Sequence, residues 1–445
     1  MRSDDVAMRV KAPDSRLPTA YRRLWLATGI DNIGNGAYVT AVPLLAITIT
    51  QDPRLVTAVS TATYLPWLLM SLPAGTLVDR SDRASLMWRA QLVAAAVVSA
   101  TAVLVALGEI SIATLAIMAF TLGTCDVVFG NAAQAILPDI VPRHLLHRAN
   151  GNQQAVITVG QLFVGPPVGS SLFAVSAFLP FGVDACSFLL SASLLRTLPK
   201  AQQQDRERQS MRVVMTGGLR WLMRHRLMRT LAVLLGVNTF CGQLANATLV
   251  LLATQTLHVG ARAYGLLLAS AAVGSVLGGL VNARIAQRIG PLPALVSALA
   301  TNVIAFVGVG YSPNAITLAG FLAINGFATT LWNIVTTTLR QQLVPSTMLG
   351  RVNGVYRMLG WGLIPLGTLT GGLIAHGLGL RAPYQLAGAV RAVALVVALP
   401  FLTTAMRTAT AERSQRYEPV NAASGSHVRE RCAPPRRTPS RHFTR

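Results

Sequence analysis

Three aspartates stand within otherwise apolar stretches of the sequence, at Asp31, Asp126 and Asp184. A charged group near the middle of a bilayer costs about 2.5–3.5 kcal/mol on insertion scales, so such a residue generally faces a cavity or a partner. A carboxylate in that setting can bind a proton or a cationic substrate group. We predict proton-coupling roles for Asp31 and Asp126, with packed, hydrogen-bonded carboxyl groups as the alternative. Asp184 follows Pro180 and Gly182, which favours a structural role near a helix start.

Polar residues accompany these carboxylates at helical spacing. Thr28, Asp31, Asn35 and Tyr38 follow a spacing of three, four and three residues, which places them on one stripe of a helix. Such a stripe should face a water-filled path, although each uncharged residue is also typical of a helix–helix hydrogen bond. The predicted substrate cavity is lined by Asn35, Tyr38, Gln154, Gln161, Asn238, Gln243, Asn325, Trp332 and Arg357.

The C-terminal half has bases inside its apolar stretches but no acids. No Asp or Glu occurs between Arg208 and Ala411, so carboxylate-based coupling must use the N-terminal half. Arg357 and Arg391 have no local acid. We expect each to snorkel, to bind an anionic group, or to pair with an aspartate of the other half.

The elements that must position these residues are membrane-spanning helices. Of the 445 residues 52% are hydrophobic and 12% charged, about half the charge of a soluble domain. Many apolar runs approach or exceed the roughly 20 residues that span a bilayer. The sequence predicts an all-α polytopic membrane protein with twelve transmembrane helices at 24–47, 55–77, 86–107, 111–137, 149–174, 178–198, 231–256, 264–286, 293–311, 315–338, 355–378 and 384–404.

Basic residues set the predicted orientation. The formal net charge of +22 would suggest nucleic acid in a soluble protein, but here the bases gather in alternate connections and in the tails. The intervening loops hold only Arg54, Arg262 and Arg381. This asymmetry predicts a multi-pass protein of the inner (plasma) membrane with both termini cytoplasmic, and no nucleic-acid partner.

The longest internal break divides the predicted helices six and six. It gives a cytoplasmic N-tail at 1–23, a six-helix bundle at 24–198, a cytoplasmic connector at 199–229, a second bundle at 230–405 and a disordered basic cytoplasmic tail at 406–445. Within the connector, apolar and arginine side chains alternate in the manner of a helix lying in the membrane interface. A basic linker is the alternative.

The two halves repeat each other in sequence. VPRHLLHRANG (141–151) aligns without gaps to VPSTMLGRVNG (344–354), and Gly75 aligns with Gly278 at the same offset. Because each repeat contains six helices, the two bundles have the same orientation, as in transporters with parallel repeats.

Specific motifs carry a family resemblance. GTLVDRSDR (75–83) resembles the signature loop of the major facilitator superfamily, with Asp82 where glycine is usual. GPPVGS (165–170) resembles part of a motif of proton-coupled exporters. The segments 137–150 and 349–367 look like the branch that contains the enterobactin exporter and macrolide and multidrug efflux proteins.

The resemblance implies a set of gating residues. In that superfamily the aspartate corresponding to Asp79 meets the start of the eleventh span and locks one state, and a helix N-terminus favours such an anion. We also expect Arg83 to pair with Asp139. Orientation signals and ordinary helix packing are the alternatives. The predicted gating residues are Gly75, Asp79, Arg80, Arg83, Asp139, Gly165, Pro166 and Gly169.

These features predict a secondary active exporter of small amphipathic compounds, such as drugs or natural products, that exchanges them for protons by alternating access. The alternatives are export of an endogenous metabolite such as a siderophore, and a non-transporting scaffold or sensor. We expect no enzyme, because no catalytic or metal constellation is visible, and no direct drive by ATP, because neither lysine lies in a Walker A motif. The expected partners are substrate, protons and the lipid bilayer, with no cofactor, no metal and a monomeric state.

Overall fold

The computed structural model describes residues 17–199 and 211–404, and its regular elements there are helical. Within these ranges, eleven helices are long and apolar enough to cross a membrane. They are Thr19–Ile49 (α1), Arg83–Leu107 (α4), Ile112–Ile140 (α5), Leu146–Val175, Leu179–Arg196 (α8), Arg226–Thr256, Ala261–Ile289 (α12), Pro291–Tyr311 (α13), Ala315–Leu343 (α14), Met348–Leu378 and Ala382–Thr404.

The twelfth predicted span is split into two helices, α2 (Pro53–Leu69) and α3 (Ser71–Arg80). Pro73 has no amide hydrogen, so the carbonyl of Leu69 loses its helical partner and the helix is interrupted at Met70. Three other spans are also composite. Their parts are α6 (Leu146–Thr158), π-helical η2 (Val159–Val164) and α7 (Gly165–Val175); α10 (Arg226–Asn246), α11 (Leu249–Leu251) and π-helical η3 (Leu252–Thr256); and α15 (Ser346–Gly362) and α16 (Ile364–Leu378).

Two helices extend a few residues beyond the domain boundaries predicted from the sequence. Helix α1 begins at Thr19 and α10 at Arg226, both inside segments predicted as tail or connector. Hydropathy marks only the apolar part of a helix, whereas its hydrogen bonding continues into the basic residues before it. The connector contains a helix, α9 (Met211–Arg224), where an interfacial helix was predicted, and α9 packs against α15. Residues 1–16, 200–210 and the predicted tail 406–445 lie outside the described part of the chain.

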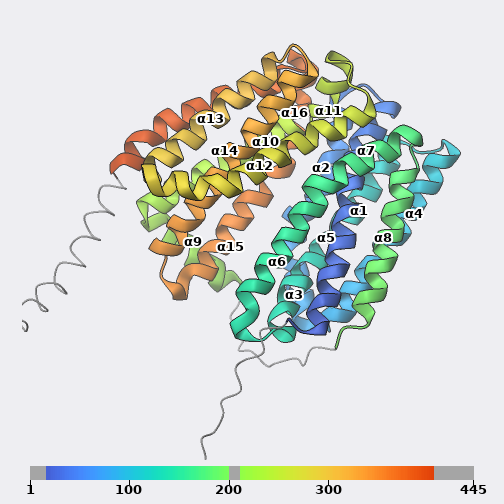
Figure 1. Cartoon of the computed structure of the whole chain (residues 1–445), viewed down its shortest axis with the longest axis horizontal. Coiled ribbons are helices and arrows are strands. Elements are labelled where there is room, and N and C mark those ends of the chain that lie inside the picture. Colours follow the sequence, from blue (N-terminus) through green and yellow to red (C-terminus); the bar gives the residue numbers. More distant parts are fainter. Residues whose placement is uncertain (1–16, 200–210, 405–445) are drawn as a thin grey trace, which may run out of the picture.

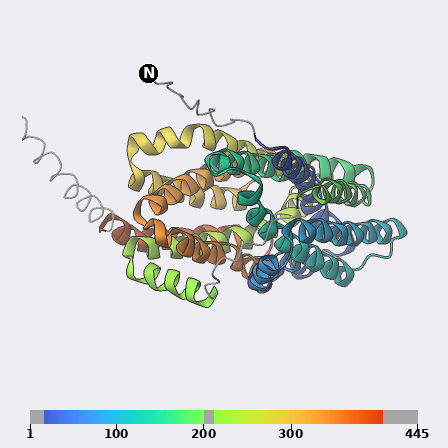
Figure 2. The ribbon, with the colours of Figure 1, turned by 90° about the horizontal axis from the view of Figure 1, so that it is seen from below.

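The helices form two groups, which we name the N-half (α1 to α8) and the C-half (α10 to Ala382–Thr404) (Figure 1). We call the end of the molecule that holds the start of α1 and α9 the basic end, and the opposite end the far end. Viewed from the basic end, the two groups lie side by side (Figure 2).

The hydrophobic core differs between the two ends. Near the far end one buried cluster contains residues of both halves, among them Val59, Phe181, Leu249 and Leu318. Near the basic end each half has a separate cluster, around Tyr21 and Ile136 in the N-half and around Leu231 and Trp332 in the C-half. The halves are therefore joined by apolar packing at the far end and packed independently at the basic end.

The sequence repeat has a structural counterpart. Helices α5 (Ile112–Ile140) and α14 (Ala315–Leu343) begin and end at positions separated by the same offset as the repeated segments. After α5, the first repeated segment forms η1 (Arg143–Leu145) and the start of α6. After α14, the second repeated segment forms the start of α15, and both segments lie at the basic end. This agreement supports a parallel arrangement of the two halves.

Packing of α12 against α14 depends on glycine. A Cβ at Gly274 would collide with the backbone carbonyl of Ala323, whereas one at Gly279 on the same helix would meet no atom within 4 Å. We expect Gly274→Leu to destabilise the C-half by about 3 kcal/mol or more, the upper end of the cost of overpacking. Gly279→Leu should leave stability nearly unchanged. Thermal unfolding of the detergent-solubilised protein compares the two variants, and equal melting temperatures would contradict the packing assignment.

Candidate transport site

A cavity of about 510 Å³ lies mainly between helices of the N-half, and we name it the N-half cavity. Leu137 and Asn150 line it at the basic end, and Tyr38 and Tyr64 line it farther in. Both predicted coupling aspartates, Asp31 on α1 and Asp126 on α5, stand on its wall. The predicted cavity residues Asn35, Tyr38, Gln154 and Gln161 also line it.

The carboxylate of Asp31 accepts a hydrogen bond from an amide side chain on a neighbouring helix. Nε2 of Gln91, on α4, donates to Oδ1 of Asp31 at 2.8 Å and lies 3.2 Å from Oγ of Ser191. The Asp31 residue is only 6% exposed. A carboxyl group oriented by one amide and bordering a cavity can take up and release a proton without changing its position. Thr28, on the same stripe, accepts a hydrogen bond from Gln153 of α6 at 2.6 Å.

Asp184 was predicted to lie near a helix start, but the structure places it inside a helix. It lies within α8, its residue is fully buried, and it faces α1, where a Cβ on Gly34 would collide with its carboxylate. Oγ of Ser187 lies 3.2 Å from its Oδ1, and its Oδ2 has no hydrogen-bond partner in the described part of the chain. Gly34 follows Asp31 by three residues, so the N-half places a third carboxylate beside the same helix.

The C-half contains a cavity of about 380 Å³, which we name the C-half cavity. It meets the N-half cavity at Gln243, Trp361 and Ile364. Four residues predicted from the sequence line it, namely Asn238, Gln243, Asn325 and Trp332. The structure therefore brings predicted residues of both halves to adjoining cavities.

Arg357 crosses from one half to the other. It lines a further pocket of about 270 Å³ beside Arg340 and Tyr356. Its Nη1 donates to Oε1 of Gln134 at 2.8 Å and its Nη2 to Oδ1 of Asn131 at 3.0 Å, both on α5. Of the options left open by the sequence, Arg357 takes the cross-interface contact, but its partners are amides instead of an aspartate.

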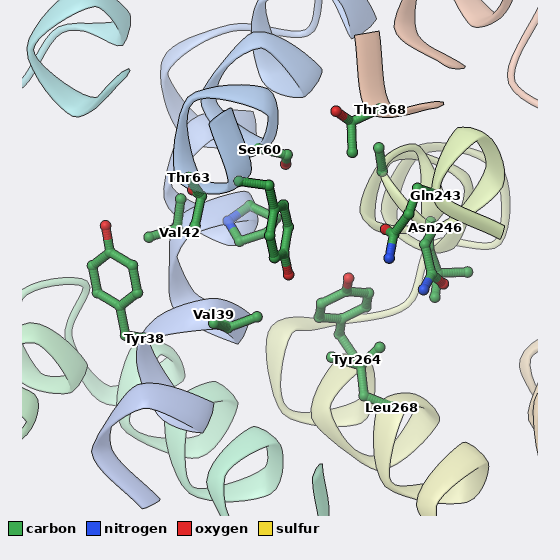
Figure 3. Close-up of a pocket in the computed structure, with 14 residues that line it drawn as sticks. Tyr38, Val39, Val42, Ser60, Thr63, Gln243, Asn246, Tyr264, Leu268 and Thr368 are labelled. Carbon is green, nitrogen blue, oxygen red and sulfur yellow. The ribbon is translucent and has the colours of Figure 1, made fainter. Parts of the chain in front are cut away.

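A smaller pocket of about 170 Å³ continues the site toward the far end, where the halves meet (Figure 3). Gln243 and Asn246 of α10 face Ser60 and Thr63 of α2 across it, and the hydroxyl of Tyr264 points into the space between these two helices (Figure 3). Polar groups thus extend from the carboxylates almost to the junction of the halves.

Small residues close that junction. Oγ1 of Thr61, on α2, lies 2.8 Å from Oγ1 of Thr368, on α16. A Cβ on Gly372 would lie 2.9 Å from the carbonyl oxygen of Pro53 and collide with Thr57. Deeper in the molecule, the rings of Trp67 on α2 and Trp361 on α15 stack with centroids 4.4 Å apart. Helices α2 and α16 are therefore in direct contact at the far end, and we name this contact the far-end seam.

The signature loop forms one of its predicted pairs. Arg83, at the start of α4, makes an ion pair with Asp139 near the end of α5 and donates to the carbonyl of Ala135 at 3.0 Å. Asp82, the departure from the superfamily pattern, caps α4 by accepting from the Ser85 amide at 3.0 Å. Gly75 lies in α3, while the side chains of Asp79 and Arg80 lie outside the described part.

The exporter-like motif produces close helix contacts. A Cβ on Gly165 or Gly169 would strike the backbone of Gly36 or Ala37 on α1, and one on Gly265 of α12 would lie 2.6 Å from the carbonyl oxygen of Pro166. Helix α7 therefore packs closely against both α1 of its own half and α12 of the other half. The π-helical segment η2 directly precedes this contact.

Comparison with known proteins agrees with this geometry. The family model described as transmembrane secretion effector matches residues 15–431. The chain belongs to this family. It is thus a multi-pass membrane transporter of the major facilitator superfamily, as its fold also indicates.

Curated relatives of this transporter are exporters by name. It is 28% identical to the multidrug efflux pump Tap of Mycolicibacterium fortuitum, over 79% of this chain and 88% of that protein. It is 26% identical to the enterobactin exporter EntS of Salmonella typhi, over 76% of this chain and 81% of that protein. A bacterial homologue of the iron transporter ferroportin, solved in an inward-facing state, has a TM-score of 0.69 at 15% identity, covering 86% of this chain and 98% of that chain.

Several site residues of the transporter were not predicted. Gln91 is the only amide side chain in the predicted span 86–107, a signal that indicates a buried partner. Trp361 follows Arg357 by four residues, so helical spacing places it on the same face. Trp67 and Gln134 carry no comparable signal, because only the packing of α2 and α5 brings them to the cavity.

The far-end loop of the transporter holds a carboxylate outside the spans. Asp52 accepts from the Arg54 amide at 2.9 Å and lies 2.8 Å from its Nη2. Hydrogen bonds from Arg54 lower the pKa of Asp52 from 3.8 to about 2. Because the pKa of Asp52 is lowered, the interaction of its carboxylate with Arg54 stabilises the folded protein fully above the ordinary pKa. This stabilisation is lost as the pH falls through about 2. Asp52 therefore stays ionised at neutral and mildly acidic pH.

Proposed function

We propose that the transporter is a secondary active exporter of small amphipathic compounds that exchanges them for protons by alternating access. One observation carries the proposal. Two halves with a common core at the far end and separate cores at the basic end enclose adjoining polar cavities, and Asp31 and Asp126 stand on the wall. A scaffold has no need of such a cavity.

The coupling role is assigned to the N-half. Asp31 and Asp126 would bind protons, and Asn35, Tyr38, Gln154, Gln161, Asn238, Gln243, Asn325, Trp332 and Arg357 would contact the substrate. The support is that Arg357 lines the further pocket of about 270 Å³ and all the others line the two adjoining cavities. Their mixture of amides and aromatic rings suits a compound with an apolar body and a few polar groups.

The gating role is assigned to contacts at both ends. The proposal places the basic end on the cytoplasmic side, since arginine gathers in its connections. The structure then corresponds to a state open to the cytoplasm, with the far-end seam closed. Conversion to the opposite state would bring Gly75, Asp79 and Arg80 of α3 toward the C-half, while the Arg83–Asp139 pair moves as one body with the N-half. The contact of Pro166 with Gly265 of α12 would be rearranged at the same time, while Gly165 and Gly169 keep α7 against α1.

Export of an endogenous metabolite is the second candidate, and the similarity to a protein named as an enterobactin exporter favours it. Both candidates use the same site and the same cycle. We further propose that the transporter acts as a monomer in the inner membrane with both termini in the cytoplasm.

Reconstitution tests the proposal. Purified transporter is placed in liposomes, a pH gradient is imposed, and a panel of fluorescent amphipathic dyes and hydroxamate or catecholate chelators is added. We expect gradient-dependent accumulation of at least one compound, abolished when a protonophore removes the gradient. Liposomes with the same lipid and no protein provide the control. Absence of flux for the whole panel would contradict export and favour a scaffold.

A further inference from the structure

The C-half cavity contains a buried cation without an acidic partner. Arg391, in the last helix, is 8% exposed and lines this cavity. Its Nη2 donates to the carbonyl of Asn238 at 2.7 Å, and its guanidinium carbon lies 3.8 Å from the centroid of the Phe306 ring. Its Nε has no hydrogen-bond partner in the described part of the chain. One peptide carbonyl, one aromatic face and the thiol of Cys241 are weak compensation for a full charge.

The surroundings offer no carboxylate to complete the compensation. No Asp or Glu occurs between Arg208 and Ala411, and within residues 17–199 and 211–404 no carboxylate of the N-half lies within ion-pair distance of Arg391. Arg340 and Arg357 in the adjoining pocket add positive charge. Arg357 is engaged by amides of α5, and Arg340 lies over the Tyr356 ring at 4.7 Å. Arg391 is thus the buried cation that lines the C-half cavity itself.

We propose that the C-half cavity is a subsite for an anionic group of the exported compound, a carboxylate or comparable oxyanion, bound by Arg391. A planar guanidinium binds such a group with two parallel hydrogen bonds, and a turn of the Arg391 side chain toward the cavity would let its unpaired Nε provide one of them. Asn325 lines the same cavity, and its Oδ1 has no partner, so it can accept from a donor beside the anionic group. Phe306, Trp332 and Ile364 provide apolar surface for the body of the molecule.

This inference rests on the proposed function and narrows its substrate class. Protons would bind the carboxylates of the N-half, while the negatively charged end of the substrate binds the C-half. The two roles are then separated in space, so an amphipathic acid is selected over an amphipathic amine of the same shape.

A matched pair of ligands tests the subsite by binding alone. We would titrate 2-naphthylacetate and 2-(2-naphthyl)ethylammonium into purified transporter in lipid nanodiscs by calorimetry at neutral pH. We expect the acid to bind at least about tenfold more tightly than the amine, and Arg391→Gln to remove that preference, as for the loss of a buried charge pair. Arg284→Gln, which removes an exposed charge at the basic end of α12, should leave both affinities unchanged.

A second variant keeps the test decisive if Arg391→Gln does not fold. Asn325→Asp retains Arg391 and places a carboxylate in the same cavity, so it should weaken binding of the acid and strengthen that of the amine. Equal affinities of the two ligands for the unmodified protein would overturn the inference, as would an unchanged preference in Arg391→Gln. Because binding requires no flux, a transporter that pumps dyes without this preference refutes the subsite alone. Preferential binding without any flux refutes only the export function.

Discussion

Asp31→Asn should abolish proton-driven export while leaving the protein folded. Asparagine can still accept the hydrogen bond from Gln91, and it has nearly the same volume, so the packing of α1 against α4 is retained. Asparagine cannot bind a proton in the relevant pH range, so proton movement down the gradient is no longer coupled to transport through this residue. We expect the initial rate of uphill export to fall at least about a hundredfold, the scale on which loss of an essential proton-transfer group is felt.

Inverted membrane vesicles provide the measurement. Gradient-driven uptake is compared with exchange of labelled for unlabelled substrate in the absence of a gradient, which Asp31→Asn should retain. Asp126→Asn, tested in the same way, establishes whether the second cavity carboxylate shares the role. Asp52→Asn is the matched control, since its amide oxygen can still cap α2 and Asp52 stays ionised over the assay range. Undiminished gradient-driven uptake in both cavity variants would remove the coupling assignment.

A disulfide across the far-end seam should stop turnover. In a variant with Cys125, Cys186, Cys241 and Cys432 replaced, Thr61→Cys and Thr368→Cys place two sulfur atoms where hydroxyl oxygens now lie 2.8 Å apart. Only a small shift then reaches the S–S bond length of about 2.05 Å. Once oxidised, the protein is held open at the basic end, and substrate flux should fall to the level of vesicles without transporter.

Three comparisons make the locking experiment specific. A reducing agent should restore flux, and each single cysteine variant should transport normally. Ser111→Cys with Thr114→Cys is the matched pair, because these oxygens also lie 2.8 Å apart but within the N-half. Oxidation of that pair should leave flux intact. Full activity of the oxidised Thr61–Thr368 variant would mean that the seam does not open during transport, and the alternating-access proposal would fail.

Much of the fold is predictable from sequence because the bilayer restricts the choices. Apolar runs of sufficient length must be helices, since backbone groups in lipid have no other partner. The repeated segments at 141–151 and 344–354 then predict the matching bounds of α5 and α14. The interruptions within spans are harder to predict. Pro73 indicates the break at Met70, but nothing in the sequence near 159–164 distinguishes a π-helical segment from an α-helix.

The candidate site is predictable where polarity conflicts with an apolar surrounding. Asp31, Asn35 and Tyr38 form a stripe whose cost in lipid indicates a cavity, and the structure places all three on one. The partners of these residues come from other helices, so helical spacing cannot identify them. Gln91 beside Asp31 and the stacked rings of Trp67 and Trp361 depend on the tertiary arrangement. Which end of the site is closed also depends on packing between the two halves, so the sequence does not predict it.

The unequal distribution of acids limits the stoichiometry of any pump built on this chain. Asp31, Asp126 and Asp184 are the carboxylates within the described spans away from their ends, and all belong to the N-half. Carboxylate chemistry therefore carries at most three protons per cycle. At a membrane potential of 100 mV each net charge contributes about 2.3 kcal/mol, roughly a fiftyfold concentration ratio. The number of these aspartates that exchange a proton in each cycle therefore limits the steepest substrate gradient that the transporter can maintain.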